Sequence, residues 1–200
     1  MKKVQNPPTR KGGVRGARRL LDPAYERRIH VTYYPEKRHK GGQMTYWRMQ
    51  LHPAEPGEAL MHSINSLAAG FIGLDFSSDV GDLRMTTKGR LPEQQKRYWP
   101  FAHEMSARDR VLVFAHQFPF ALATVDGDYN YIRTPEPEIG VWFRHFRRVR
   151  DVRYYGDFIK NAHNWETITM TETITPLREP SSRSYQLIEE WLAASRDLAA

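Results

Sequence analysis

The 200-residue chain contains no cysteine. This absence excludes a disulfide framework, a thiolate nucleophile and a zinc site built from cysteine, and it fits the reducing environment of the cytoplasm. No stretch approaches the roughly 18 consecutive apolar residues that a membrane span needs. The basic N-terminus lacks the apolar stretch of a signal peptide. We therefore expect a cytoplasmic protein that makes no contact with a membrane.

Catalytic signatures are also missing. The sequence holds no Walker loop, no GxGxxG and no GxSxG, and none of its eight histidines forms an i, i+4 pair on a predicted helix. Asp75, Asp79 and Asp82 lie close enough in sequence to bind a cation, but a solvated loop is the better interpretation. We therefore predict a protein that is not an enzyme and that carries no metal and no cofactor.

Acidic residues are scarce at the N-terminus. Residues 1–43 hold 12 Lys and Arg against three Asp and Glu, a net charge of +9, whereas the other 157 residues hold 18 against 20. Few apolar residues and several Pro and Gly predict an extended basic arm over residues 1–43, with 29–34 as a short strand. Such an arm neutralises phosphates, and Arg15, Arg18 and Arg19 are its predicted contacts. A solubilising tail is the alternative.

The rest of the chain predicts an α+β domain over residues 44–178 and a C-terminal helix packed on it over residues 179–200. Residues 111–114 are too apolar for an edge strand, so we place them in the middle of a sheet beside residues 121–125. The element order β-α-β-(α)-β-β-β-β-α favours a strongly curved sheet or a small barrel. The remaining predicted strands are 45–51, 71–76, 144–153 and 167–175; the predicted helices are 56–69, 92–105 (interrupted by Pro100) and 184–198.

Aromatic side chains fall at strand ends and in loops as well as at strand centres. Flat rings next to cationic strands are how proteins hold single bases, because the rings stack on the base while Arg meets the phosphates. Any single ring is more often part of the core, so the prediction concerns the set, of which two or three rings would line a pocket. The set is Trp47, Phe76, Tyr98, Trp99, Phe101, Phe118, Phe120, Trp142 and Trp165.

Five motifs, in order over residues 44–175, resemble the EVE domain of the PUA-like superfamily. The chain is most similar to the YTH-related variant at the N-terminus of Mcr-type modification-dependent restriction enzymes. The resemblance implies a pseudo-barrel of five to six strands flanked by helices, which takes a modified base, flipped from DNA or exposed in RNA, into an aromatic cage. The motifs are Trp47-Arg48, Ile72-Gly73-Leu74, residues 109–111 (DRV), residues 125–131 (VDGDYNY) and residues 147–149 (RRV).

The sequence departs from the family at two points. Leu74 stands where the family often has Trp, and Phe76, on the same strand face, would supply the missing ring. Arg108-Asp109 opens the central strand without the usual glycine. The base pocket implied by the resemblance has Trp99 or Phe101 as a lid and Gln117 or Ser77 as a hydrogen-bond partner for the base edge. Its residues are Trp47, Phe76, Ser77, Trp99, Phe101, His116, Gln117 and Phe118; the predicted phosphate contacts on the domain are Arg144, Arg147, Arg148 and Arg150.

These observations predict a non-catalytic module that reads a modified base, methylated or otherwise substituted, in DNA rather than RNA, as part of defence or restriction. The domain leaves no room for a nuclease or NTPase domain, so we expect a partner protein to supply cleavage. The alternatives are an RNA-binding PUA-like protein, a protein-interaction module of phage origin whose basic arm contacts an acidic partner, and a nuclease.

Overall fold

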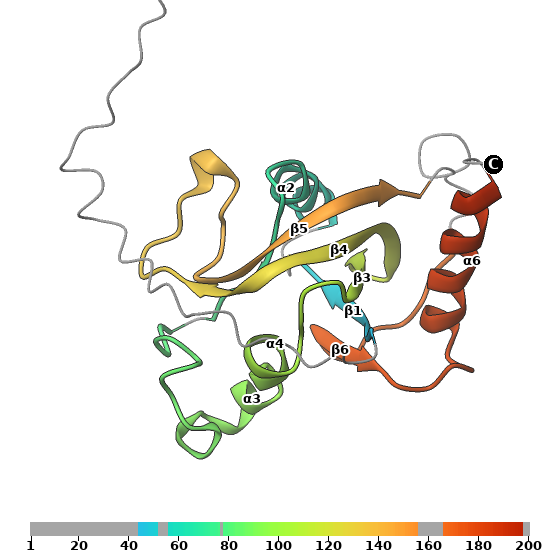
Figure 1. The fold of residues 1–200 in the computed structure, drawn as a ribbon. Helices are drawn as coiled ribbons and strands as arrows, with labels where there is room; N and C mark the ends of the chain where they lie inside the picture. Colours follow the sequence, from blue (N-terminus) through green and yellow to red (C-terminus); the bar gives the residue numbers. More distant parts are fainter. Residues whose placement is uncertain (1–43, 52–55, 77, 156–165, 198–200) are drawn as a thin grey trace, which may run out of the picture. The chain divides into compact units, whose positions relative to one another are not determined.

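The architecture is α+β, built on one six-stranded sheet that curls into a half-barrel (Figure 1). A computed structural model describes residues 44–51, 56–76, 78–155 and 166–197. The predicted order of strands and helices is confirmed. In the sheet the strands run in the order β2-β5-β4-β3-β1-β6. The strands are β1 (Tyr46–Gln50), β2 (Phe71–Leu74), β3 (Arg110–Ala115), β4 (Phe118–Tyr131), β5 (His145–Tyr154) and β6 (Ile174–Leu177).

Helices lie on both faces of this sheet (Figure 1). They are α2 (Pro56–Ala68), α3 (Glu93–Lys96), α4 (Trp99–His103) and α6 (Arg183–Asp197), with single 3-10 turns at Lys88–Arg90 and Pro137–Ile139. Gly70 follows α2 with a φ of +81°, a left-handed conformation that glycine adopts without strain and that commonly ends a helix. Within the part of the chain described, no helix combines the length and the apolar character needed to cross a bilayer.

Two hydrophobic clusters hold the layers together. The inner face of the sheet packs on α2 and α4, and its cluster includes Leu67, Phe101 and Val113. The outer face packs on α6 through Leu187 and Ile188. Strand β3 contributes alternate residues to both clusters, which is why residues 111–114 are all fully buried. The prediction of a central strand beside 121–125 is confirmed, because β3 lies between β1 and β4.

The Gly-Asp-Tyr motif of the sequence marks a bulge in β4. Val125 pairs with Val149 and Tyr129 pairs with Arg147, so three residues of β4 stand opposite one residue of β5. A bulge bends its strand and increases the local twist. This bend lets the 14-residue β4 run from the sheet centre to the end where the candidate site lies.

Two local predictions were wrong. Residues 167–173 are not a strand; β6 covers only Ile174–Leu177. The alternation there arises because Ile168 and Met170 pack against the outer cluster without strand pairing. Pro176 is tolerated in β6 because β6 is an edge strand. Pro100 does not interrupt a helix but lies in the first turn of α4, where its missing N–H costs nothing.

The glycine of the Ile-Gly-Leu motif has a packing role. A Cβ atom added at Gly73 would lie 1.9 Å from the ring of Phe143. Phe143 is itself 2% exposed, so its ring has no room to move aside. The motif therefore fixes the close approach of β2 to the chain segment that leads into β5.

Candidate functional site: an aromatic cluster at one end of the sheet

The structure does not bring the predicted base-pocket residues together. His116 and Gln117 form the turn between β3 and β4, and Phe118 begins β4. Phe76 follows β2 and lies beside His145, which pairs with Tyr131 at the opposite end of β4. At about 3.3 Å per residue, a strand of 14 residues separates these two groups by tens of ångströms. The turn and Phe76 therefore belong to different surfaces.

Three of the predicted rings have structural partners instead. Trp47 is 1% exposed, and its indole N–H donates to the carboxylate of Asp109 at 2.8 Å. Phe101 is fully buried in the inner cluster. The ring of Trp99 stacks on His103 with centroids 3.7 Å apart. None of these rings lies against Phe76. Ser77 and the arm residues Arg15, Arg18 and Arg19 lie outside the described residues.

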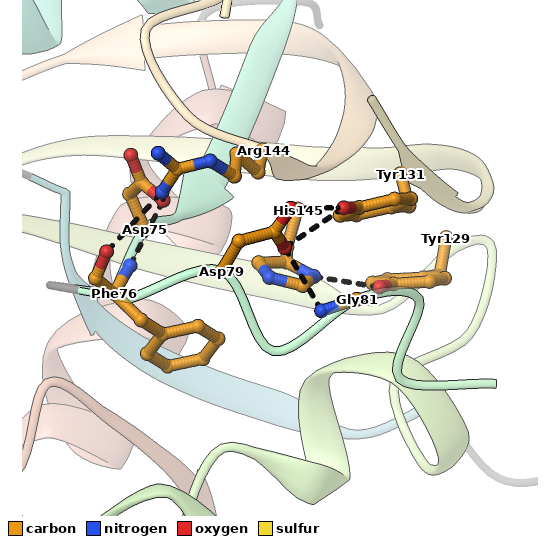
Figure 2. Close-up of polar contacts among 8 residues, drawn as sticks. All are labelled: Asp75, Phe76, Asp79, Gly81, Tyr129, Tyr131, Arg144 and His145. Carbon is orange, nitrogen blue, oxygen red and sulfur yellow. Dashed lines mark hydrogen bonds and ion pairs between the residues drawn. The ribbon is translucent and has the colours of Figure 1, made fainter. Parts of the chain in front are cut away.

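Phe76 belongs to a different group, which we call the aromatic cluster. It consists of Phe76, Tyr98, Tyr129, Tyr131 and His145. Phe76 is half-buried, and its ring lies 5.0 Å from that of Tyr98 and 4.9 Å from that of His145, measured between centroids. The ring of His145 also faces both tyrosines, at 6.0 and 5.2 Å. Figure 2 shows the imidazole lying between Phe76 and the two tyrosines.

The bulge in β4 explains why these rings share one face. Tyr129 and Tyr131 are two residues apart in a strand, so their side chains point the same way. The shifted register then pairs Tyr131 with His145. Tyr98 comes from the segment between α3 and α4, and Phe76 from the loop after β2. Four separate segments thus meet at one end of the sheet.

His145 is fully buried but keeps one polar atom without a partner. Its Nδ1 lies 2.7 Å from the hydroxyl of Tyr129, which also accepts a bond from the backbone N–H of Leu83 at 3.1 Å. The Nε2 atom is buried and makes no hydrogen bond. Burial lowers the pKa of His145 to about 4, although the charge of Asp79 raises it; the charge of Arg144 lowers it further. The imidazole is therefore neutral at physiological pH.

Charged side chains at the border of the cluster make specific hydrogen bonds. The hydroxyl of Tyr131 donates to both oxygens of Asp79 at 2.8 Å, and the backbone N–H of Gly81 donates to the same carboxylate (Figure 2). Burial raises the pKa of Asp79, but these bonds and the nearby Arg144 outweigh it, so the net shift is downward. Burial and the bond to Asp79 raise the pKa of Tyr131 to about 12. Asp79 is thus a fixed anion that orients a neutral tyrosine.

Asp75 is held in the same way. Arg144 donates to its carboxylate at 2.6 Å and to the backbone oxygen of Phe76 at 3.2 Å. These contacts anchor the loop that carries Phe76. Among the described residues no group of three His, Asp or Glu side chains is arranged to hold a metal ion. The aspartates at 75 and 79 instead make the contacts above.

Acidification is expected to destabilise the fold through His145. The unfolded chain takes up a proton on this histidine near its ordinary pKa of 6.5, whereas the folded protein resists protonation until about pH 4. The stabilisation is complete above pH 6.5 and is lost as the pH falls, by about 2 kcal/mol at about pH 5. Urea unfolding near neutral pH and near pH 5 measures this loss. His145→Phe should reduce the difference between the two conditions by that amount; an unchanged difference would contradict the assignment.

The arginines of β5 divide between two faces. Arg147 points inward and is 1% exposed. Arg148 and Arg150 are exposed on the outer face, where Arg150 pairs with Asp126 at 3.0 Å. Of the four predicted phosphate contacts on the domain, Arg144 borders the aromatic cluster beside Phe76, whereas Arg147 is buried next to Tyr129. Arg147 is not available to meet a phosphate, because its guanidinium is enclosed by backbone carbonyls.

Two arginines outside the predicted set border the cluster. The guanidinium of Arg97 lies 5.3 Å from the ring centroid of Tyr98, and it pairs with Glu172 at 3.1 Å. Arg133 is exposed and close enough to Tyr131 to lower the pKa of its hydroxyl, against the larger upward effect of burial. With Arg144 they form what we call the rim arginines: Arg97, Arg133 and Arg144.

A separate hollow of about 330 Å³ lies at the edge formed by β1 and β6. Its walls carry Glu104 and Arg178, which pair with each other at 3.4 Å. It contains no member of the aromatic cluster. The charges of these two side chains therefore neutralise each other.

No family model and no curated protein matches the chain. Its function must therefore be argued from the site itself. The predicted site residues include Phe76 and Arg144, whereas Tyr98, Tyr129, Tyr131 and His145 lie outside the predicted pocket. The VDGDYNY motif contained a usable signal, because the spacing of its two tyrosines puts both rings on one strand face.

Proposed function

We propose that this protein is a non-catalytic nucleic-acid-binding module that holds one unstacked base against the aromatic cluster. The observation that carries the proposal is the half-buried ring of Phe76, which covers a neutral, fully buried imidazole with an unbonded nitrogen. A site for a flipped base needs aromatic walls and a few polar groups for the base edge. The cluster supplies both within one group of contacts.

Stacking would provide the binding energy. Each base that stacks on an aromatic ring contributes about 1–3 kcal/mol. Phe76 and Tyr98 are both partly exposed and lie in contact, so they offer ring surface at the protein's exterior. Tyr129 and His145 are buried behind them and give the site a rigid floor.

The rim arginines would meet the phosphates on either side of the base. Arg133 is exposed and Arg97 is about half exposed, so both can reach a backbone outside the cluster. Arg148 and Arg150 face the other side of the sheet, and we assign them no role in holding this base. The basic segment of residues 1–43 would add affinity that does not depend on sequence.

The curled six-stranded sheet is compatible with a PUA-like pseudo-barrel, and we propose that the chain is an EVE-type reader of this kind. A modified base in DNA is the ligand we favour, with RNA as the alternative. Any cleavage would come from a partner nuclease or NTPase. The motif resemblance supports these finer points, and the aromatic cluster supports base binding itself.

Phe76→Ala is expected to weaken selective binding, and Phe118→Ala is the matched control. Both substitutions remove a partly exposed phenyl ring, but Phe118 lies at the other end of β4. Losing one stacked base of about 1–3 kcal/mol should lower affinity roughly 5- to 150-fold. The measurement is fluorescence anisotropy with identical duplexes that contain unmodified cytosine, methylcytosine, hydroxymethylcytosine, glucosylated cytosine or methyladenine.

The same titrations at rising salt separate the contribution of the base to binding from that of the phosphate backbone. Nonspecific binding should fall steeply with salt in wild type and in both variants alike. A preference for one duplex that survives Phe76→Ala but not Phe118→Ala would move the site to the hairpin turn. Equal affinity for all duplexes would reduce the protein to a general nucleic-acid binder, and no binding at low salt would end the proposal.

A further inference from the structure

One buried nitrogen in the aromatic cluster has no partner in the fold. His145 has no exposed surface, and its Nε2 atom makes no hydrogen bond. A buried polar atom left unpaired costs about 1–3 kcal/mol. Figure 2 shows the imidazole turned so that one ring nitrogen meets Tyr129 and the other side of the ring faces Phe76. The unpaired atom therefore lies on the side that carries the half-buried ring.

The hydrogen-bond network indicates which nitrogen carries the proton. The hydroxyl of Tyr129 accepts from the backbone N–H of Leu83, so its own hydrogen is available to donate. Its remaining neighbour is Nδ1 of His145, at 2.7 Å. A neutral imidazole that accepts at Nδ1 must carry its hydrogen on Nε2. In the tautomer in which the hydroxyl of Tyr129 donates to Nδ1, the unpaired Nε2 is an N–H donor on the side of the ring that faces Phe76.

We propose that Nε2–H of His145 donates a hydrogen bond to the edge of the bound base, which must present an acceptor such as a carbonyl oxygen or an unprotonated ring nitrogen. This inference rests on the proposed function and adds its edge chemistry. Phe76 now covers the imidazole, so its ring would turn aside to stack on the base while His145 reads the base edge. Tyr129 acts as a positioning residue, since its hydroxyl sets the tautomer of the histidine.

The neutral state of the imidazole strengthens this assignment. Burial keeps the ring uncharged, so the site offers a single directed donor and carries no net charge of its own at the base edge. A site of this type rejects an analogue that lacks the acceptor, because the buried donor is then left unpaired. Selectivity would therefore depend on the hydrogen-bonding edge of the base and not on ring shape alone.

The test uses the full chain and short DNA strands built from abasic residues around one central base. The central positions are adenine, guanine, cytosine, thymine, 5-methylcytosine and difluorotoluene, an apolar ring with the shape of thymine. His145→Phe keeps a flat ring but removes the donor, and His145→Gln restores an N–H. Tyr129→Phe breaks the same internal hydrogen bond without removing the Nε2 atom, so it controls for a purely structural effect.

We expect His145→Phe to weaken binding of the preferred natural or methylated base by about 5- to 150-fold, as for one lost hydrogen bond. Binding of difluorotoluene should not change, and His145→Gln should recover part of the loss. In wild type, nitrogen-15 spectra of labelled histidine should show hydrogen on Nε2, with its proton signal shifting downfield when the base binds. Tyr129→Phe should lower the affinity by less than His145→Phe does, because the Nε2 atom remains although its tautomer is no longer fixed.

The possible failures are distinguishable. If the strands bind no better than a fully abasic strand, the proposed function itself fails. If binding depends on the base and on Phe76 but His145→Phe binds as wild type does, only the donor assignment is overturned. Equal losses in His145→Phe and Tyr129→Phe, with no spectral change on Nε2, would also overturn it, because they would show that the histidine acts only through the fold.

Discussion

Replacing Arg147 with methionine is expected to lower the free energy of unfolding by about 2–6 kcal/mol, because two buried carbonyls lose their donor at about 1–3 kcal/mol each. The side chain is 1% exposed, and its guanidinium donates to the backbone oxygens of Phe101 at 2.8 Å, Gly127 at 3.1 Å and Ala102 at 3.3 Å. Methionine fills much of the same volume but cannot donate to these carbonyls, and the bonds to Phe101 and Ala102 lie in the interior. Burial lowers the pKa of Arg147 to about 10, so the group still carries its charge at neutral pH.

The expected damage from Arg147→Met extends to the aromatic cluster. Phe101 and Ala102 belong to α4, whose preceding residue Tyr98 contacts Phe76, while Gly127 lies in the bulge of β4 that leads to Tyr129. Arg147 therefore joins the two segments that carry opposite sides of the cluster. Hydrogen exchange should accelerate in α4 and in the bulge of the variant.

The neighbouring residue provides a matched control. Arg148 stands on the same strand but is exposed, and its guanidinium lies 6.0 Å from the ring of Phe71. Arg148→Met should change stability by only about 0.5 kcal/mol, as other surface substitutions do. Chemical unfolding of both variants measures the difference. If Arg147→Met costs no more than Arg148→Met, the guanidinium does not bridge the two segments.

Asp109→Asn is expected to lower the free energy of unfolding by about 2–4 kcal/mol. The carboxylate is 3% exposed and accepts three N–H bonds, from the indole of Trp47 at 2.8 Å and from the backbones of Thr45 and Ser106 at 2.9 Å. An asparagine keeps the shape but replaces one oxygen with an NH₂ group, which faces donors and cannot accept from them. Buried bonds to a charged group contribute about 1.5–3 kcal/mol each, and at least one would be lost.

The control for Asp109→Asn is the same substitution at Asp126. That carboxylate is about half exposed and pairs with Arg150 on the outer face, so its loss should cost at most about 1 kcal/mol. Trp47→Phe removes the indole donor and leaves the backbone donors satisfied, but it also opens a cavity beside the smaller ring. A double-mutant cycle of the two changes should show coupling. Additive effects would contradict the contact.

These two sites show what the motifs of the sequence do in the fold. The motifs that resemble the EVE domain include Trp47, Asp109 and Arg147. The sequence predicts that Trp47 lines the base pocket and that Arg147 meets a phosphate. All three are buried and join separate segments of the interior. Burial could not be inferred for Asp109 and Arg147, because Asp and Arg are rarely buried unless partners exist elsewhere in the chain.

The order of the elements, the central position of β3 and the absence of cysteine chemistry can be predicted from the sequence. These features depend on local periodicity and composition, which are visible in any short window. The neighbours of Phe76 cannot be predicted in this way. Its ring contacts His145 and Tyr98 and lies far from the turn at His116. The bulge at residues 126–128 shifts the register of β4 against β5, and a shift in pairing changes which distant side chains become neighbours. The site therefore depends on pairings between segments far apart in the chain, which no local pattern specifies.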